Sequence, residues 1–254
     1  MSVMDLDRIT HPLRLAKGSH RPGSGKGCAM NAISYINGDA QITDFPACSA
    51  RPLALLVQSC NDLLAGPDGY LSPENSVLAL EVAWQTVGTA DVPDTVVHAW
   101  LAELLTNPAW GVVRYVKLTA VKAIFDIAKL HCDAAAGDMP PIAAWNAAEH
   151  AARAAAQTMN PVSNAACANA LKAAYQSAAL VGARHYQATL AVVTAGAVGA
   201  HARATEGNTV SHIVEVTRHA IRSWRGLAGL DNPVDKPASV KRKVVVKTEF
   251  VLSH

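Results

Sequence analysis

Residues 18–48 hold side chains whose types and spacing could do chemistry, in the order GSHRPGSGKGCAMNAISYINGDAQITDFPAC. Their glycine-rich turn brings Cys28 to the start of a predicted helix, where the helix dipole lowers the pKa of a thiol. Such a thiolate becomes a catalytic nucleophile when a histidine base and an orienting polar group lie beside it. The candidates are Cys28 as nucleophile, His20 as base and Asp44 as orienting group, with His98 and His131 as more distant bases.

The same segment also offers thiol and imidazole groups, which suit Zn²⁺. The candidate metal ligands are His20, Cys28 and Cys48, with Asp44 or Cys60 as a further donor. Structural zinc sites usually supply their ligands in close pairs such as C-x2-C, and these cysteines form no such pair. A metal site is therefore one alternative, and burial of Cys28 as a small apolar residue is another.

A third interpretation places an anion at the N-terminus of the same helix, held by backbone N–H groups of the glycine-rich turn. The candidate cofactor-binding residues are Gly25, Lys26 and Gly27, and Arg21 adds positive charge. The segment is not a P-loop, because His20 replaces the first glycine of that motif and Gly27 replaces its Ser or Thr. A flexible entry loop is the simpler interpretation.

Helices are expected to position these groups, since apolar residues recur at helical spacing along most of the chain. The first helix is expected to end at Gly38, because glycine is typical of helix C-termini. Ser72 is expected to cap a later helix, with Pro73 at its first position, and Asp94 is expected to cap the next. In the N-terminal half the predicted helices span residues 28–37, 52–64, 77–88, 95–105 and 112–131.

From residue 142 onward the chain is rich in alanine, which favours helices and lets neighbouring helices approach closely. We expect three or four helices there, separated by turns at Asn160-Pro161 and Glu206-Gly207-Asn208. The large side chains expected between the helices are Trp145, Tyr175, Tyr186 and Trp224. The histidines interpreted as solvated helix residues are His131, His150, His185, His201, His212 and His219.

After residue 229 two proline turns form a linker, and the run KRKVVVKTEFVL predicts a strand. This tail is interpreted either as an edge strand or exchangeable arm, or as a disordered basic tail. The predicted fold is therefore all-α, a multi-helix bundle with an irregular Gly-rich N-terminal loop and a short C-terminal β-strand or arm. We expect one helical domain over residues 1–229, with an N-terminal module (1–66) and alanine-rich helices (72–229), followed by the tail (230–254).

Composition restricts the class of protein. Half of the 254 residues are apolar, which is enough for a sizeable core without metal or disulfide staples. The 22 basic and 20 acidic residues leave a net charge of +2, so only the basic C-terminal arm could favour nucleic acid. Five scattered cysteines and a charged N-terminus indicate a reducing compartment, the cytoplasm, or a host cytoplasm or virion if the protein is phage-encoded. Residues 188–200 are too few to form a transmembrane segment.

The N-terminal module resembles a known sequence pattern. The run GKGCAMNAISYING, then TDFPAC and Asn61-Asp62, is similar to a group of actinobacterial and phage proteins that carry no assigned function. Asn31 stands where that group has glutamate, so any role of that carboxylate is absent here. Asp44 could cap a turn and Asn61-Asp62 could close a helix. The matching residues, which could equally form a structural knot, are Cys28, Met30, Thr43, Asp44, Pro46, Cys48, Asn61 and Asp62.

Two classes of function follow from these patterns. Close-packing alanine and the lack of a complete catalytic set favour a non-enzymatic binding or assembly protein. It would bind a protein partner or further copies of itself through its helical surface and C-terminal arm. The alternative is a small enzyme, or a ligand- or metal-binding protein, with its site in residues 18–48 and Cys28 as nucleophile or zinc ligand. The sequence predicts no particular cofactor.

Overall fold

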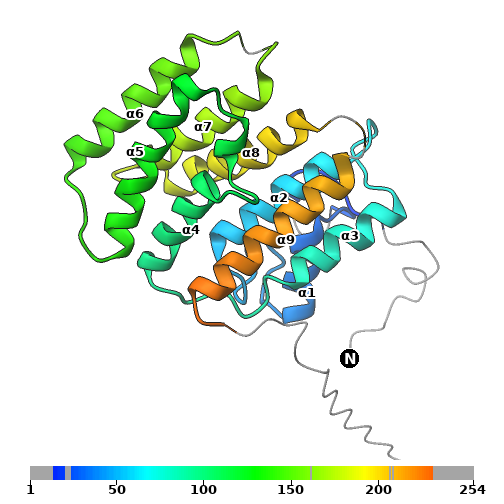
Figure 1. Ribbon diagram of the computed structural model, residues 1–254. Coiled ribbons are helices and arrows are strands. Elements are labelled where there is room, and N and C mark those ends of the chain that lie inside the picture. The colour runs from blue at the N-terminus through cyan, green and yellow to red at the C-terminus, as the bar shows by residue number, and fades with distance from the viewer. Residues whose placement is uncertain (1–13, 21–23, 161, 206, 208, 231–254) are drawn as a thin grey trace, which may run out of the picture.

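The computed structural model describes residues 14–20, 24–160, 162–205, 207 and 209–230, and these are mainly helical (Figure 1). The helices are α1 (Ala29–Asn37), α2 (Arg51–Leu64), α3 (Pro73–Trp84), α4 (Asp94–Thr106), the 3-10 helix η2 (Val112–Tyr115), α5 (Leu118–Ala135), α6 (Ile142–Gln157), α7 (Ala165–Ala179), α8 (Tyr186–Ala204) and α9 (Thr209–Leu227). Within these ranges β-structure is limited to isolated bridges. The all-α prediction is confirmed, while the predicted arm at residues 240–252 lies outside the described residues.

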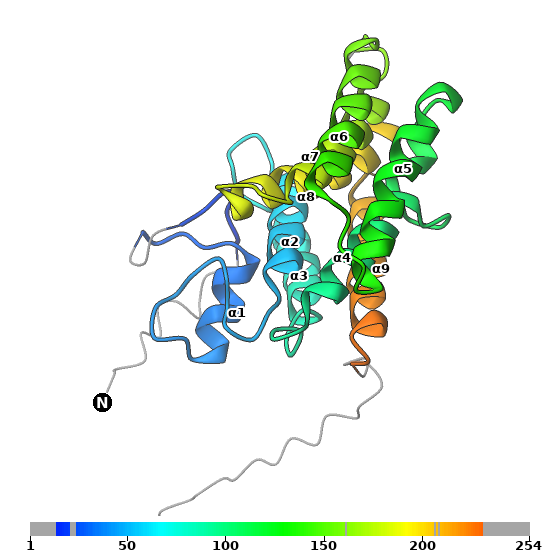
Figure 2. The ribbon, with the colours of Figure 1, turned by 90° about the vertical axis from the view of Figure 1, so that its left-hand side faces the viewer.

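The helices form two groups that share one core. Figures 1 and 2 show α5, α6 and α7 together on one side and α1, α2, α3 and α9 on the other. Helix α8 packs against α7 and also against α2 and α9, while α4 packs against both α5 and α9. The buried side chains form one cluster that runs from Leu15 to Trp224. Along the described part of the chain, no helix is both long and apolar enough to cross a bilayer.

Two of the predicted helix ends are confirmed, and a third is corrected. Gly38 follows α1 with a left-handed φ of 79°, and the Ser72 hydroxyl accepts the Asn75 N–H at the start of α3. Asp94, however, is the first residue of α4, and its side chain makes no cap hydrogen bond because Pro93 occupies the cap position. The Asp94 carboxylate is therefore not used by the backbone of its own helix.

The single helix predicted over residues 112–131 is divided into η2 and α5. Val116 and Lys117 adopt extended backbone between the two elements. Valine loses side-chain rotamer freedom in a helix, which lowers the cost of an interruption in this valine-rich stretch. As a result Tyr115 turns toward α8 instead of continuing along α5, and its hydroxyl lies 2.7 Å from Nδ1 of His201.

Tryptophans, more than tyrosines, fill the space between the helices. Trp145 and Trp224 are fully buried as expected, and so is Trp100, whose indole N–H donates to the Ala220 carbonyl at 2.8 Å. Trp100 meets Trp224 edge to face, with ring centroids 5.6 Å apart. Tyr186 is 44% exposed, so it does not act as a wedge. Its position at the start of α8 leaves its ring at the surface.

A substitution at Gly111 is expected to lower stability by about 2 kcal/mol, because it would overpack a backbone contact. A Cβ at this residue would lie 2.4 Å from the backbone nitrogen of Asn107 and 2.6 Å from its carbonyl oxygen. Urea unfolding of Gly111→Ala should show the loss. The matched control is Gly226→Ala in α9, where a Cβ meets nothing within 4 Å and alanine favours the helix. Equal stability of Gly111→Ala and the wild type would contradict this packing.

Candidate functional site

The glycine-rich loop is attached to α2 by the two polar residues near the end of that helix. The buried Asn61 amide accepts the Ala29 N–H at 3.2 Å and donates to the Ala16 carbonyl at 3.0 Å. The neighbouring Asp62 carboxylate accepts the Gly18 N–H at 2.8 Å. Asn61 and Asp62 therefore hold the loop and the start of α1, instead of closing the end of α2.

Asn31 joins the start of α1 to the following turn. Its side-chain oxygen accepts the Cys28 N–H at 2.9 Å, and its NH₂ group donates to Asp44 at 2.9 Å. A glutamate at this position could accept the same N–H but would place a second carboxylate against Asp44. Asp44 thus bridges to Asn31 and Cys28, and these three residues form a hydrogen-bonded network at the start of α1.

The Cys28 thiol differs from the activated nucleophile expected from its helix position. It is 1% exposed, and it makes a weak polar contact with Asp44, with Sγ 3.5 Å from Oδ1. Burial, together with the negative charge of Asp44, raises the pKa of Cys28 to about 12, even though backbone hydrogen bonds at the helix start oppose the shift. Desolvation therefore outweighs the helix dipole, and the thiol stays protonated at neutral pH.

The other proposed partners of Cys28 are used elsewhere. The His20 ring lies against the Ala16 carbonyl, with Nε2 3.3 Å from the oxygen. His98 and His131 contact each other and not Cys28. Across the described ranges, no three His, Cys, Asp or Glu side chains come close enough to share a metal ion. The structure thus does not assemble His20, Cys28 and Cys48 into a ligand set.

The predicted anion cradle is filled by the protein itself. The backbone N–H groups of Cys28 and Ala29 point at the side-chain oxygens of Asn31 and Asn61, and the Asn31 N–H points at the Cys28 side chain. These groups are therefore unavailable to a phosphate. The Gly27 carbonyl accepts the Ala16 N–H, and the Lys26 ammonium lies 5.2 Å from the centre of the Tyr70 ring. Gly27 and Lys26 therefore contact other parts of the protein, and Gly25 is exposed with a left-handed φ of 71°.

Thiol labelling should report this arrangement. Under native conditions iodoacetamide is expected to modify the exposed Cys132 first, and to leave Cys28 and Cys60 unmodified until the protein unfolds. Burial raises the pKa of Cys60 to about 11, so both thiols are protected by protonation as well as by access. Peptide mapping by mass spectrometry identifies the labelled residue, and Cys132→Ser provides the control. Rapid labelling of Cys28 in the folded protein would contradict the geometry.

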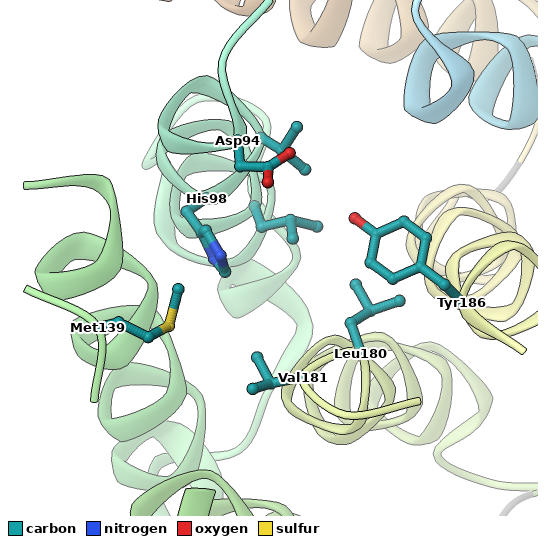
Figure 3. A pocket seen from close by; sticks show the side chains of 8 residues that line it. Asp94, His98, Met139, Leu180, Val181 and Tyr186 are labelled. Atoms are coloured by element: carbon teal, nitrogen blue, oxygen red, sulfur yellow. The ribbon is translucent and has the colours of Figure 1, made fainter. Parts of the chain in front are cut away.

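An open pocket lies between α4 and the turn that joins α7 to α8 (Figure 3). Its volume is about 210 Å³. Asp94, Val97, His98 and Leu101 come from one face of α4, since residues three and four apart lie on the same side of a helix. The opposite side is formed by Leu180, Val181 and Tyr186, and Met139 closes one edge.

Three polar groups line this pocket, and each keeps an atom without a protein partner. Among the described residues, no hydrogen bond or ion pair reaches the Asp94 carboxylate, the Tyr186 hydroxyl or Nε2 of His98. In Figure 3 the Tyr186 hydroxyl points toward Asp94 across the pocket. The negative charge of Asp94 contributes, after burial, to raising the pKa of Tyr186. The pocket thus combines an apolar wall with three groups that are free to bind a ligand.

His98 is connected to the interior through a second histidine. Its Nδ1 lies 2.9 Å from Nδ1 of His131, so one proton is shared between the two rings. His131 is fully buried and packs edge to face on Trp145, with ring centroids 4.8 Å apart. Burial, and then the neighbouring His98, lower the pKa of His131 to about 3, so this ring is neutral. The expectation of a solvated His131 is therefore wrong.

A second histidine cluster lies where η2 meets α8 and α9. The Tyr115 hydroxyl lies 2.7 Å from Nδ1 of His201 and 3.3 Å from Nε2 of His212. His201 is 1% exposed, and burial is the main reason that its pKa falls to about 4. His201 lies in the last turn of α8, but it is buried and hydrogen-bonded and not solvated as expected.

Another hollow, between α2 and α8, has polar groups that are mostly engaged, and the Lys17 ammonium is the exception among its described lining residues. It is lined in part by Ser59 and Asp62. Ser59 donates to the Leu55 carbonyl, and Asp62 accepts from Gly18. The pocket beside α4 is therefore the better candidate site.

Local sequence patterns indicate this pocket only weakly. The spacing of Asp94, His98 and Leu101 places polar and apolar side chains together on one face of a helix. The opposite wall of the pocket follows α7 in the chain, and only the packing of the helices brings it to α4.

Comparisons of the chain with protein-family models, curated proteins and solved structures find no match. The candidate function therefore rests on the side chains described above.

Proposed function

We propose that this chain is a non-enzymatic binding protein, and that it binds a small ligand in the pocket formed by Asp94, His98 and Tyr186. The observation that carries the proposal is that the Asp94 carboxylate, the Tyr186 hydroxyl and Nε2 of His98 converge on one partly apolar pocket, and none of the three has a partner among the described residues. Ligand sites commonly combine an apolar lining with a few polar groups that orient the ligand. This pocket has that composition, and its volume of about 210 Å³ suits a small molecule.

Binding is favoured over catalysis because the thiol site offers no activated group. Cys28 is buried and protonated, and neither His20 nor any other described histidine contacts it. In the pocket, His98 and Asp94 lie on the same side of α4 without a hydrogen bond between them. A nucleophile, a base and an orienting group in mutual contact would be needed for acyl transfer. The geometry thus gives more support to recognition than to chemistry.

A screen of small fragments by protein-observed NMR tests this proposal. We expect fragments to shift signals of α4 and of the α7–α8 turn in the wild type. Val181→Phe should fill the pocket and abolish these shifts. Val162→Phe is the matched control, because Val162 is 88% exposed and does not line the pocket. The proposal would be overturned if no fragment bound, or if Val181→Phe bound fragments as well as the wild type.

A protein partner or self-association through the helical surface is a second candidate. It is favoured by Leu118 and Phe125, which are 92% and 50% exposed and lie seven residues apart on one face of α5. Light scattering of the wild type and of Leu118→Asp/Phe125→Asp tests this surface. A monomer in both cases, with no partner recovered, would remove it. The contribution of the arm, the phage or actinobacterial origin and the cytoplasmic location stay predictions.

A further inference from the structure

We infer that the pocket beside α4 binds a small primary amine in its ammonium form, carried on a short apolar body such as a single ring. The inference rests on the proposed ligand-binding function and specifies its ligand class. It is drawn from the charge of the pocket, from the hydrogen-bonding capacity of its three polar groups and from its walls.

The charge of the pocket comes from Asp94. No described lysine or arginine forms an ion pair with this carboxylate. The negative charge of Asp94 acts to raise the pKa of both His98 and Tyr186, the two ring side chains of the pocket. An anionic ligand would be repelled by Asp94, whereas a cation would gain an ion pair with this exposed carboxylate. A cation supplies the missing partner, and hydrogen bonds between charged groups are stronger than those between neutral groups.

His98 can serve as a second acceptor because of its contact with His131. Burial lowers the pKa of His98, so its ring is neutral at pH 7 and one of its nitrogens carries a lone pair. When His98 donates its Nδ1 proton to Nδ1 of His131, Nε2 of His98 becomes that acceptor. The buried partner accepts the hydrogen bond without becoming charged.

Tyr186 supplies the third hydrogen-bond acceptor of the pocket. In Figure 3 its hydroxyl and the Asp94 carboxylate face each other, and the His98 ring lies on the same side of the pocket as Asp94. A primary ammonium has three N–H donors, which matches a carboxylate, a phenol oxygen and an imidazole nitrogen as three acceptors. The aromatic ring of Tyr186 also favours a nearby cation.

The apolar side of the pocket limits the rest of the ligand. Val97, Leu101, Leu180 and Val181 present hydrocarbon surface, and Met139 adds a flexible thioether at the edge. These walls favour an apolar body attached to the ammonium group. A volume of about 210 Å³ leaves room for a ring but not for a nucleotide.

Three probes of equal shape test the ligand class: benzylamine, benzyl alcohol and benzoate, each titrated by NMR at pH 7. We expect benzylamine to bind about 10-fold more tightly than benzyl alcohol, and benzoate to be the weakest. Asp94→Asn should remove the preference for benzylamine over benzyl alcohol. Asp91→Asn is the matched control, because Asp91 is exposed and lies outside the pocket lining.

The His98 ring gives a second readout. Nitrogen-15 NMR should show benzylamine shifting His98 toward the tautomer with unprotonated Nε2, and benzyl alcohol having a smaller effect. Equal affinities for all three probes, or an unchanged amine preference in Asp94→Asn, would overturn the amine inference and leave the ligand-binding proposal standing. Failure of every fragment and probe to bind would overturn the ligand-binding proposal itself.

Discussion

Lowering the pH from about 7 to about 5 is expected to reduce the free energy of unfolding by about 4 kcal/mol, since two buried histidines are neutral in the folded protein. His131 and His201 have ordinary pKa values of 6.5 when unfolded, and about 3 and about 4 when folded. Each contributes about 2 kcal/mol over this range. This is a large part of the stability of a typical domain.

The sign of the effect follows from which state binds the proton. Below pH 6.5 the unfolded chain protonates these histidines, while the folded protein does not until the pH approaches 3 to 4. The unfolded state therefore gains protons and is stabilised as the pH falls. Burial is the main cause for both rings, reinforced by His98 beside His131 and by His212 beside His201.

Denaturant unfolding at several pH values measures this dependence. His131→Leu cannot take up the proton and should lose about half of the acid effect. His150→Leu is the matched control, because His150 is exposed on α6, and it should keep the whole effect. If His131→Leu does not fold, NMR titration of the wild type should still show an unprotonated His131 ring at pH 5. A stability that does not change between pH 7 and 5 would contradict the burial of these rings.

Replacing Asn61 by alanine is expected to lower the free energy of unfolding by about 3 kcal/mol. The substitution leaves the Ala29 N–H buried without its partner, and it leaves the Ala16 carbonyl only its contact with Nε2 of His20. An unsatisfied buried backbone group costs about 1–3 kcal/mol, and the lost bond to Ala16 adds to this cost. Because these two bonds join the loop and α1 to α2, amide hydrogen exchange at Ala29 should accelerate as well. Urea unfolding and hydrogen exchange together measure both effects.

Asn37→Ala provides the control for this prediction. Asn37 is exposed at the end of α1, and within the described part of the chain its amide bonds only to Asp39. Its loss should change stability by less than about 0.5 kcal/mol. Equal effects of the two asparagine substitutions would show that Asn61 does not hold the loop. Other contacts would then have to position the hydrogen-bonded network around Cys28.

Much of the helical framework was predictable from local patterns. Gly38, Ser72 and Pro73 mark helix ends through their own backbone preferences, which act over a few residues. The prediction was wrong at Asp94, where Pro93 takes the cap, and at Val116 and Lys117, where the chain leaves the helix. At Val116 and Lys117 the chain leaves a helical pattern, whereas at Asp94 the cap moves to the preceding proline and the helix begins one residue earlier than predicted.

The predicted site illustrates what local patterns cannot decide. Cys28, His20 and Asp44 lie close together in the sequence, but the reactivity of a thiol depends on its burial and on the direction of each side chain. Cys28 points into the core, where desolvation raises the pKa that the helix dipole was expected to lower. The segment therefore resembles a site in its residue types, while its contacts are those of a structural network.

By itself, the sequence determined the all-α class, the positions of most helices and the polar residues available in the N-terminal module, because periodicity and helix-end chemistry are local properties. Only the tertiary structure decided which polar groups are buried, paired or free. It joined Asn61 to Ala16 and Ala29, paired His98 with His131, and brought Tyr186 to face Asp94. These contacts connect residues far apart in the chain, and they exist only because helix packing fixes where each side chain lies.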